Sequence, residues 1–165
     1  MNKLDEDIKE LQIRLKGGSI QRAYRGIVLY MSRLRTVFAG QQGERTVSGI
    51  YQGYFDMTYF ALFPDALKVR NLKLAIVFNY ETFNFEVWLA AQNRKVQKRY
   101  WELLRKAGYK KHSLIEPTVG IDAIVTAVLK EKFSLEAENS LTAQIIEGVM
   151  AFERDIIEFL NEVDA

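Results

Sequence analysis

The strongest constraint on the fold is a pair of alternating apolar segments, 72–80 and 84–91, that follow each other closely. Alternation with a period of two is typical of strands that bury one face, so the pair predicts an antiparallel hairpin. A turn at Thr82 and Phe83 pairs Leu74 with Ala91, Ile76 with Leu89, Phe78 with Val87 and Tyr80 with Phe85 on one face, and Asn79 with Glu86 and Val77 with Trp88 on the other. Thr-Phe is a poor two-residue turn, which leaves a longer loop as the alternative.

Apolar residues recur at helical spacing in five other segments. We predict helices over residues 4–16, 19–39, 92–107 and 138–162, and a fifth helix after Pro117. The first helix is expected to bury a stripe formed by Leu4, Ile8, Leu11 and Leu15 and to end at Gly17-Gly18. The fifth is expected to turn inward Ile121, Ile124, Val125, Val128 and Leu129.

Two more segments, 51–63 and 112–115, have the composition of strands. In the longer one, a shared face is expected for Gln52, Tyr54, Asp56, Thr58, Phe60 and Leu62. Pro64 closes this strand and opens a short helical turn. The expected class is therefore α+β, with a mainly antiparallel sheet of about four strands flanked by helices in the order ααβββαβαα. No repeat or flexible linker divides the chain, so residues 1–165 are predicted to form one domain.

Composition excludes several classes of enzyme. The 165 residues include no cysteine and one histidine, His112, which rules out thiol catalysis, iron-sulfur clusters and zinc sites with cysteine ligands. Neither a phosphate-binding loop nor a Gly-x-Ser-x-Gly motif is present. We therefore predict no catalytic residue, no metal site and no cofactor.

Charge is segregated along the chain. The net charge is −2 over residues 1–13, +12 over residues 14–111 and −8 over residues 112–165. This layout indicates either a surface for polyanions or an internal match between the acidic C-terminal helix and the basic middle, and we favour the internal match.

The N-terminal segment is acidic and amphipathic, unlike a signal peptide. Apolar runs are short pieces such as LAIVF, far below the roughly 20 residues that span a bilayer. A cytoplasmic location with no membrane partner is the expectation.

Two segments of the chain resemble segments of a known protein family: GIYQGYFDMTYFALFPDALKVRNLKLAIVFN and FNFEVWLAAQNRKVQKRYWELLRKAGY. They are similar to an uncharacterised family of small bacterial cytoplasmic proteins of similar length. The resemblance covers most of the chain and implies the same fold and a bacterial source. It implies no activity, and so no catalytic residues.

A polar and aromatic face of the predicted sheet is the first candidate site. We expect a cleft there that binds a small ligand or a protein partner. Its candidate residues are Arg35, Gln52, Tyr54, Asp56, Glu86, Trp88 and Asn93. The structural alternative is that Arg35 pairs with Asp56 or Glu86 in a partly buried salt bridge.

Three other interpretations stay open. The predicted order of elements is similar to the core of restriction-endonuclease-like proteins, in which acids on two strands and a lysine hold magnesium and cut a phosphodiester. The acids available here are Asp56, Asp65 and Glu86, but Trp88 stands where the lysine should be.

A second interpretation is polyanion binding by the basic helix, through Arg94, Lys95, Lys98 and Arg99. A third is a homodimer sealed by the apolar stripe of the C-terminal helix. The favoured function is a non-enzymatic binding or interaction domain, with a nucleic-acid-binding or degenerate nuclease-like domain as the alternative.

Overall fold

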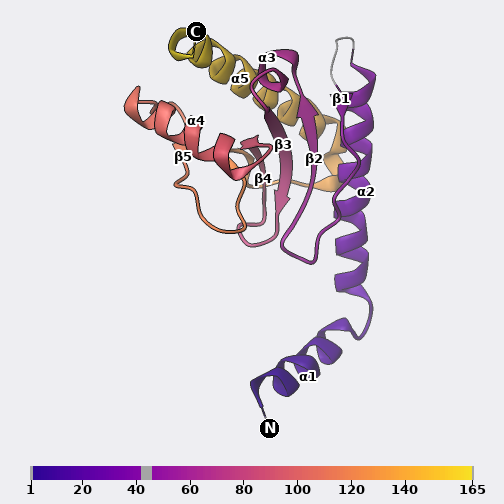
Figure 1. Cartoon of the computed structure of the whole chain (residues 1–165). Coiled ribbons are helices and arrows are strands. Elements are labelled where there is room, and N and C mark those ends of the chain that lie inside the picture. Colours follow the sequence, from indigo (N-terminus) through magenta and orange to yellow (C-terminus); the bar gives the residue numbers. More distant parts are fainter. Residues whose placement is uncertain (1, 42–45, 165) are drawn as a thin grey trace.

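A computed structural model describes residues 2–41 and 46–164 (Figure 1). These residues form an α+β fold around one antiparallel sheet with the strand order β1-β2-β3-β4-β6-β5. The strands are β1 (Thr46–Val47), β2 (Met57–Phe63), β3 (Leu72–Asn79), β4 (Asn84–Ala91), β5 (Ser113–Leu114) and β6 (Ala123–Lys130). The helices are α1 (Lys3–Leu15), α2 (Ser19–Gly40), α3 (Asp65–Lys68), α4 (Arg94–Lys106) and α5 (Glu138–Val163), with a 3₁₀ turn η1 (Leu135–Ala137). The α+β class is confirmed, but the expected number of about four strands is wrong, because the described residues form six.

The hairpin of β3 and β4 is confirmed, whereas its predicted register is wrong by two residues. The structure pairs Leu74 with Leu89, Ile76 with Val87 and Phe78 with Phe85. The cause is a longer loop, residues 80–83, in which Phe83 has a φ of 55° and the Thr82 hydroxyl donates to the Asn84 side chain at 2.8 Å. Because side chains alternate with a period of two, this shift changes every partner but keeps each side chain on its predicted face.

Residues 123–130 form strand β6, so the helix predicted after Pro117 is wrong. Its apolar spacing resembles a helix because Ala123, Ile124 and Val125 are all buried, which removes the alternation typical of a half-exposed strand. The β-branched residues Ile124, Val125, Thr126 and Val128 favour the strand. β6 pairs with β4 on one side and with β5 on the other.

Strand β2 is shorter than predicted. It begins at Met57, while the chain before it turns at Gly53 and Phe55, which have φ values of 80° and 62°. The preceding residues return to the sheet through one bridge, between Tyr51 and Tyr59. The predicted loop before this segment includes residues 42–45, which lie outside the described residues.

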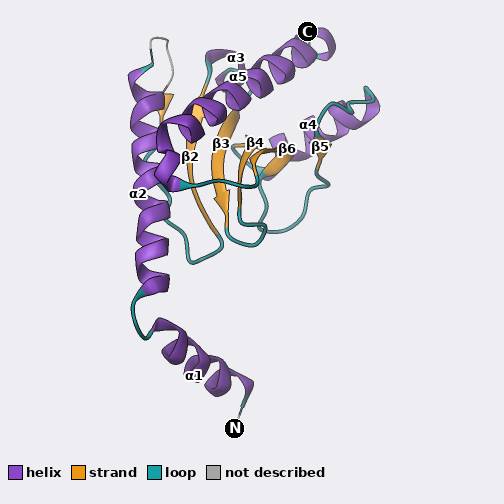
Figure 2. Ribbon diagram, turned by 180° about the vertical axis from the view of Figure 1, so that it is seen from behind, coloured by secondary structure: helices purple, strands orange, loops and turns teal. Residues whose placement is uncertain are grey.

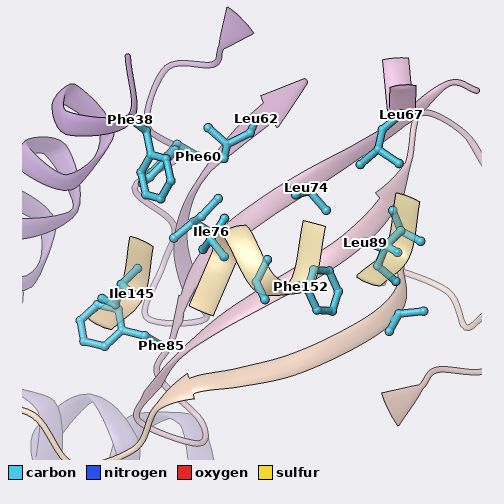
Figure 3. Close-up of a cluster of buried hydrophobic side chains, with 14 of the residues drawn as sticks. Phe38, Phe60, Leu62, Leu67, Leu74, Ile76, Phe85, Leu89, Ile145 and Phe152 are labelled. Atoms are coloured by element: carbon cyan, nitrogen blue, oxygen red, sulfur yellow. The ribbon is translucent and has the colours of Figure 1, made fainter. Parts of the chain in front are cut away.

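Helices α2 and α5 cover one face of the sheet (Figure 2). Phe38 and Tyr30 of α2 contact Phe60 and Phe85 of the sheet, with ring centroids 5.8 and 5.6 Å apart. Figure 3 shows Ile145 and Phe152 of α5 among the side chains of the strands in this core. The buried apolar residues of α5 are Leu141, Ile145, Val149, Phe152, Ile156 and Leu160. This stripe is therefore occupied within the chain and is not available as the homodimer surface suggested by the sequence.

Helix α1 forms as predicted, but its apolar stripe is not buried. Asn2 caps the helix by accepting from the Asp5 amide at 2.9 Å, and Glu10 pairs with Arg14 at 2.6 Å, so local interactions support the helix. None of its residues is buried. Figures 1 and 2 show α1 projecting away from the sheet beyond the end of α2. None of the described helices is long and apolar enough to cross a membrane.

Asp164, which follows α5, links three segments. Its carboxylate accepts from the Tyr100 hydroxyl at 2.7 Å and lies 3.2 Å from both Arg70 and Arg99. The hydrogen bond from Tyr100 and the two guanidinium charges lower the pKa of Asp164. Burial and the same hydrogen bond raise the pKa of Tyr100 to about 12. This network fixes the end of α5 against α4 and against the residues that follow α3.

We expect Asp164→Asn to lower the free energy of unfolding by about 1–3 kcal/mol at neutral pH. Because folding lowers the pKa of Asp164, its contribution is complete above the ordinary value of 3.8 and is lost as the pH falls through the folded value. Urea unfolding in steps from neutral pH to about pH 3 should therefore show the gap between wild type and variant narrowing at the acid end. The exposed Glu162→Gln is the control. A gap that is constant over this range would contradict a role for the charge.

Candidate functional site

The sheet face opposite α2 and α5 carries a cleft of about 280 Å³. Leu74 and Ile76 of β3 point toward the helices. Because successive side chains on a strand point to opposite faces, Lys73, Ala75 and Val77 point into the cleft. Its floor is formed by the small side chains of Ala75, Val77 and Ala90, all of which are buried. Larger side chains at these positions would fill the space. Its walls and rim include Tyr51, Asp56, Tyr59, Lys73, Trp88 and Asp122.

Aromatic side chains stand on both sides of this floor. Trp88 lies on β4 and Tyr59 on β2, with the floor residues of β3 between them. Two strand spacings, about 10 Å, separate the backbones that carry these rings. Tyr51 packs on Tyr59 with a centroid distance of 5.0 Å, which extends the β2 wall. The cleft is therefore a slot with aromatic sides and a flat apolar floor.

The rim loop, residues 51–56, is fastened to α2. The hydroxyl of Tyr24 lies 3.1 Å from the carbonyl oxygens of both Gln52 and Gly53. The ring of Tyr24 packs on Phe55 at 4.3 Å between centroids. The Thr58 hydroxyl also donates to the Gln52 carbonyl, at 2.6 Å. The loop is thus held in place from α2 and from β2.

Asp56 and Gly53 shape the same loop. The carboxylate of Asp56 accepts from the backbone amides of Tyr54 and Met57, and these hydrogen bonds lower its pKa. A Cβ at Gly53 would lie 1.9 Å from the Met57 carbonyl oxygen, so only glycine fits there. Asp56 is therefore ionised and is oriented toward the cleft by its own loop.

Trp88 is positioned by Glu86. The indole Nε1 donates to one carboxylate oxygen of Glu86 at 2.7 Å. The other oxygen accepts from the Thr82 hydroxyl at 3.0 Å and from the Asn79 amide at 3.5 Å. Glu86 is only 8% exposed, and these donors compensate for the removal of its carboxylate from water. The ring that forms one wall of the cleft thus has a fixed orientation.

The charges in the cleft are unequally buried. Lys73 is half-buried on β3 beside Ala90, and within the described part of the chain its ammonium forms no hydrogen bond or ion pair. Asp56 and Asp122 are exposed at the rim. Asp122 and Tyr59 both line the cleft, and burial, followed by the charge of Asp122, raises the pKa of Tyr59. The inner charge of the cleft is therefore positive and has no partner among the described residues, and the outer charges are negative.

Of the candidate residues, the structure brings Asp56 and Trp88 into the cleft and places Glu86 behind Trp88. Gln52 lies instead along a groove beside α2, and Tyr54 points into solvent with 89% of its surface exposed. Gln52 and Tyr54 are not in the cleft because the even-numbered residues of β2, whose face they were predicted to share, point toward the core. Thr58 pairs with Phe78 on the core face, so the odd-numbered residues of β2 face the cleft.

Arg35 and Asn93 have structural roles away from the cleft. Arg35 donates to the Ser48 carbonyl, which joins α2 to the chain before β2. Among the described residues it forms no ion pair with Asp56 or Glu86, so the predicted alternative, a salt bridge of Arg35 with one of these acids, is wrong. Asn93 caps α4 by accepting from the Val96 amide at 3.0 Å.

Sequence reasoning misses three residues of the cleft: Tyr51, Tyr59 and Asp122. Lys73, the lone charge in the apolar string LKLAIVF, does share the predicted polar face with Asp56 and Trp88, although it is not among the candidate residues. Tyr59 follows from the correct register of β2. Asp122 precedes β6 and is hidden by the helical spacing of that segment.

The basic residues proposed for polyanions, Arg94, Lys95, Lys98 and Arg99, are all exposed on α4. Two of them have partners: Arg94 donates to the Thr118 carbonyl at 2.8 Å, and Arg99 pairs with Asp164. Lys95 and Lys98 form no ion pair with any residue that the structure describes. Arg94 and Lys98 also line a groove together with Trp101.

A magnesium-dependent nuclease site is not assembled in the described residues. They contain no group of three or more acidic or histidine side chains that could hold a metal ion. Asp56 lies at the cleft rim, Asp65 begins α3, and Glu86 is engaged by Trp88. The acids that the sequence suggested for metal binding are thus on different parts of the fold.

A family model matches residues 4–160, almost the whole chain. The chain belongs to the DUF7000 family. The description of this family, a domain of unknown function, confirms the resemblance to an uncharacterised family and supplies no activity. Comparisons of this DUF7000 member with curated proteins and with solved structures give no match.

We expect Glu86→Ala to release the Trp88 ring. The indole N–H loses its acceptor, so its NMR signal should move and its hydrogen exchange should accelerate, with a loss of about 1–3 kcal/mol in the free energy of unfolding. The signal of Trp101 provides an internal reference, since the chain contains two tryptophans. Glu81→Gln, an exposed change in the same hairpin loop, is the matched control. An unchanged Trp88 signal in Glu86→Ala would show that the carboxylate does not position the ring.

Proposed function

We propose that the protein is a binding module whose cleft holds a small planar molecule that carries an anionic group. The observation that carries this proposal is Lys73, a half-buried residue on a central strand whose ammonium has no partner among the described residues. A charge in a partly enclosed site attracts an opposite charge more strongly than one in open water, because the effective dielectric constant is lower there. An anionic group on a ligand would pair with this ammonium.

The walls support a ring as the body of the ligand. Trp88 and Tyr59 present aromatic surface on both sides of the alanine and valine floor. Planar rings stack favourably on such surfaces. A volume of about 280 Å³ lies just below the usual range for ligand sites, which favours a molecule with one small ring system.

The rim supports a polar substituent at the other end. Asp56 and Asp122 are exposed acceptors at the mouth of the cleft. A donor group on the ligand, such as an amine or an amide, would donate a hydrogen bond to one of these carboxylates and would remain partly hydrated. The inner anion and the outer donor together define the orientation of the ligand.

Three probes that share a pyridine ring and carry an anionic, a neutral or a cationic substituent at the same ring position test this proposal: nicotinate, nicotinamide and 3-picolylamine. We expect nicotinate to bind best and to shift the Trp88 indole signal. Lys73→Met should weaken its binding by about tenfold or more, which corresponds to about 1.4 kcal/mol. Lys68→Met, an exposed change on α3, is the control and should leave binding unchanged. Absence of any Trp88 shift with all three probes at millimolar concentration would reject the proposed ligand class.

A second candidate function is supported by α4. Lys95 and Lys98 are exposed without acidic partners among the described residues, and Trp101 lies beside Lys98 in a shallow groove. Cations that track a phosphate backbone and an aromatic ring that stacks on a base are the usual components of single-strand binding. This surface is separate from the cleft, so the two functions are tested independently.

Binding of labelled single- and double-stranded DNA and RNA at two salt concentrations tests this second function. If α4 binds nucleic acid, single strands are bound and affinity falls steeply with salt. Each of Lys95→Glu and Lys98→Glu should then reduce the salt dependence by about one unit of slope. Lys132→Glu, an exposed change outside α4, is the control. No binding at low salt would remove α4 from consideration.

A further inference from the structure

Helix α1 exposes an apolar stripe that nothing in the described chain covers. Leu4, Ile8 and Leu11 have 64%, 54% and 53% of their surfaces exposed. Their spacing places them on one face of the helix. Exposed apolar side chains arranged as a continuous stripe are typical of an interaction surface and not of an isolated helix.

A groove beside α2 is apolar, like this stripe. It has a volume of about 430 Å³ and is lined by Leu15, Ile20, Tyr24, Val28, Leu29 and Phe55. Leu29 and Phe55 are half exposed, at 50% and 55%. Leu15 belongs both to the stripe of α1 and to this groove, so the two surfaces are continuous.

The elbow between the helices keeps α1 away from the groove of its own chain. Gly17 and Gly18 both have positive φ values, 85° and 75°. The side chain of Gln21 donates to the Leu15 carbonyl at 3.0 Å, and that of Arg22 donates to the Gly17 carbonyl at 2.9 Å. These bonds hold α1 in the projecting position seen in Figure 1. Its stripe is thereby presented to another molecule.

Charge identifies that molecule. Helix α2 contains four arginines and no acidic residue, and Arg22 and Arg25 lie on either side of Leu29 around the helix. On α1, whose net charge is −1, Asp5 and Asp7 flank the apolar stripe, and Arg14, which lies beside Asp7, is paired with Glu10 at 2.6 Å. Aspartates on both sides of the stripe complement this arginine-bearing groove. The matching groove belongs to the same chain type.

We propose that two copies of the chain associate through these surfaces. The α1 stripe of each copy lies in the α2 groove of the other, and the two contacts are related by a twofold axis. Each copy then buries its stripe and its groove at once. The aspartates of α1 face the arginines of the partner's α2. This association involves neither the sheet cleft nor α4, so it stands independently of the functions proposed above.

Sedimentation of the full chain at about 1–100 μM measures the association. We expect a species of twice the chain mass of 19.1 kDa. The double substitution Ile8→Asp with Leu11→Asp should give a monomer. Since α1 contributes no buried residue to the fold, this variant should stay folded, with the unfolding midpoint that the wild type shows at concentrations where it is monomeric. A wild-type monomer throughout the range would overturn the proposal.

Ile13 provides the matched control. It is also apolar and 59% exposed, but it lies about 170° around α1 from the centre of the stripe. Ile13→Asp should therefore leave the dimer intact. A dimer that survives the double substitution in the stripe, or is lost equally in Ile13→Asp, would place the interface elsewhere and overturn the proposal.

Cross-linking tests which helices meet. The chain has no cysteine, so Ile8→Cys and Leu29→Cys each introduce a single thiol. On mixing the two variants under oxidising conditions, we expect a disulfide between different copies. Ile13→Cys mixed with Leu29→Cys should give at least tenfold less of it. Equal yields from the two mixtures would contradict a contact between α1 and the partner's α2.

Discussion

The packing of α2 and α5 on a single face of the sheet determines the rest of the structure. Each apolar side chain that α5 buries contributes about 1.5–3 kcal/mol, and six are buried, so this contact outweighs the network of 1–3 kcal/mol around Asp164. Because strands alternate, committing Leu74 and Ile76 to this core commits Ala75 and Val77 to the opposite face. The cleft is thus a consequence of how the core is built.

Periodicity predicts the elements that have one clear period. The β3–β4 hairpin and the amphipathic helices α2, α4 and α5 are recovered from sequence for this reason. The hairpin register is wrong because loop length depends on local hydrogen bonds, such as that between Thr82 and Asn84. Strand β6 is mistaken for a helix because both of its faces are buried at one end. Periodicity also predicts that α1 is amphipathic, but it does not tell whether the stripe has a partner within the chain.

The candidate site is predicted less completely than the fold. Trp88 and Asp56 are recovered because aromatic and acidic residues stand out on strands and loops. Arg35 and Asn93 are attractive on the same grounds, but a carbonyl and a helix end use them instead. Lys73 becomes significant only once its surroundings are known, since burial and the absence of a partner among the described residues are properties of the folded chain.

The two outermost strands, β1 and β5, have two residues each, Thr46–Val47 and Ser113–Leu114. An edge this short offers few free backbone amides and carbonyls to an incoming strand. These two strands themselves therefore provide little template for strand addition, the usual route by which sheet proteins aggregate. Side chains on helices and in the cleft offer contacts of another kind, in which recognition depends on shape and charge and can be specific.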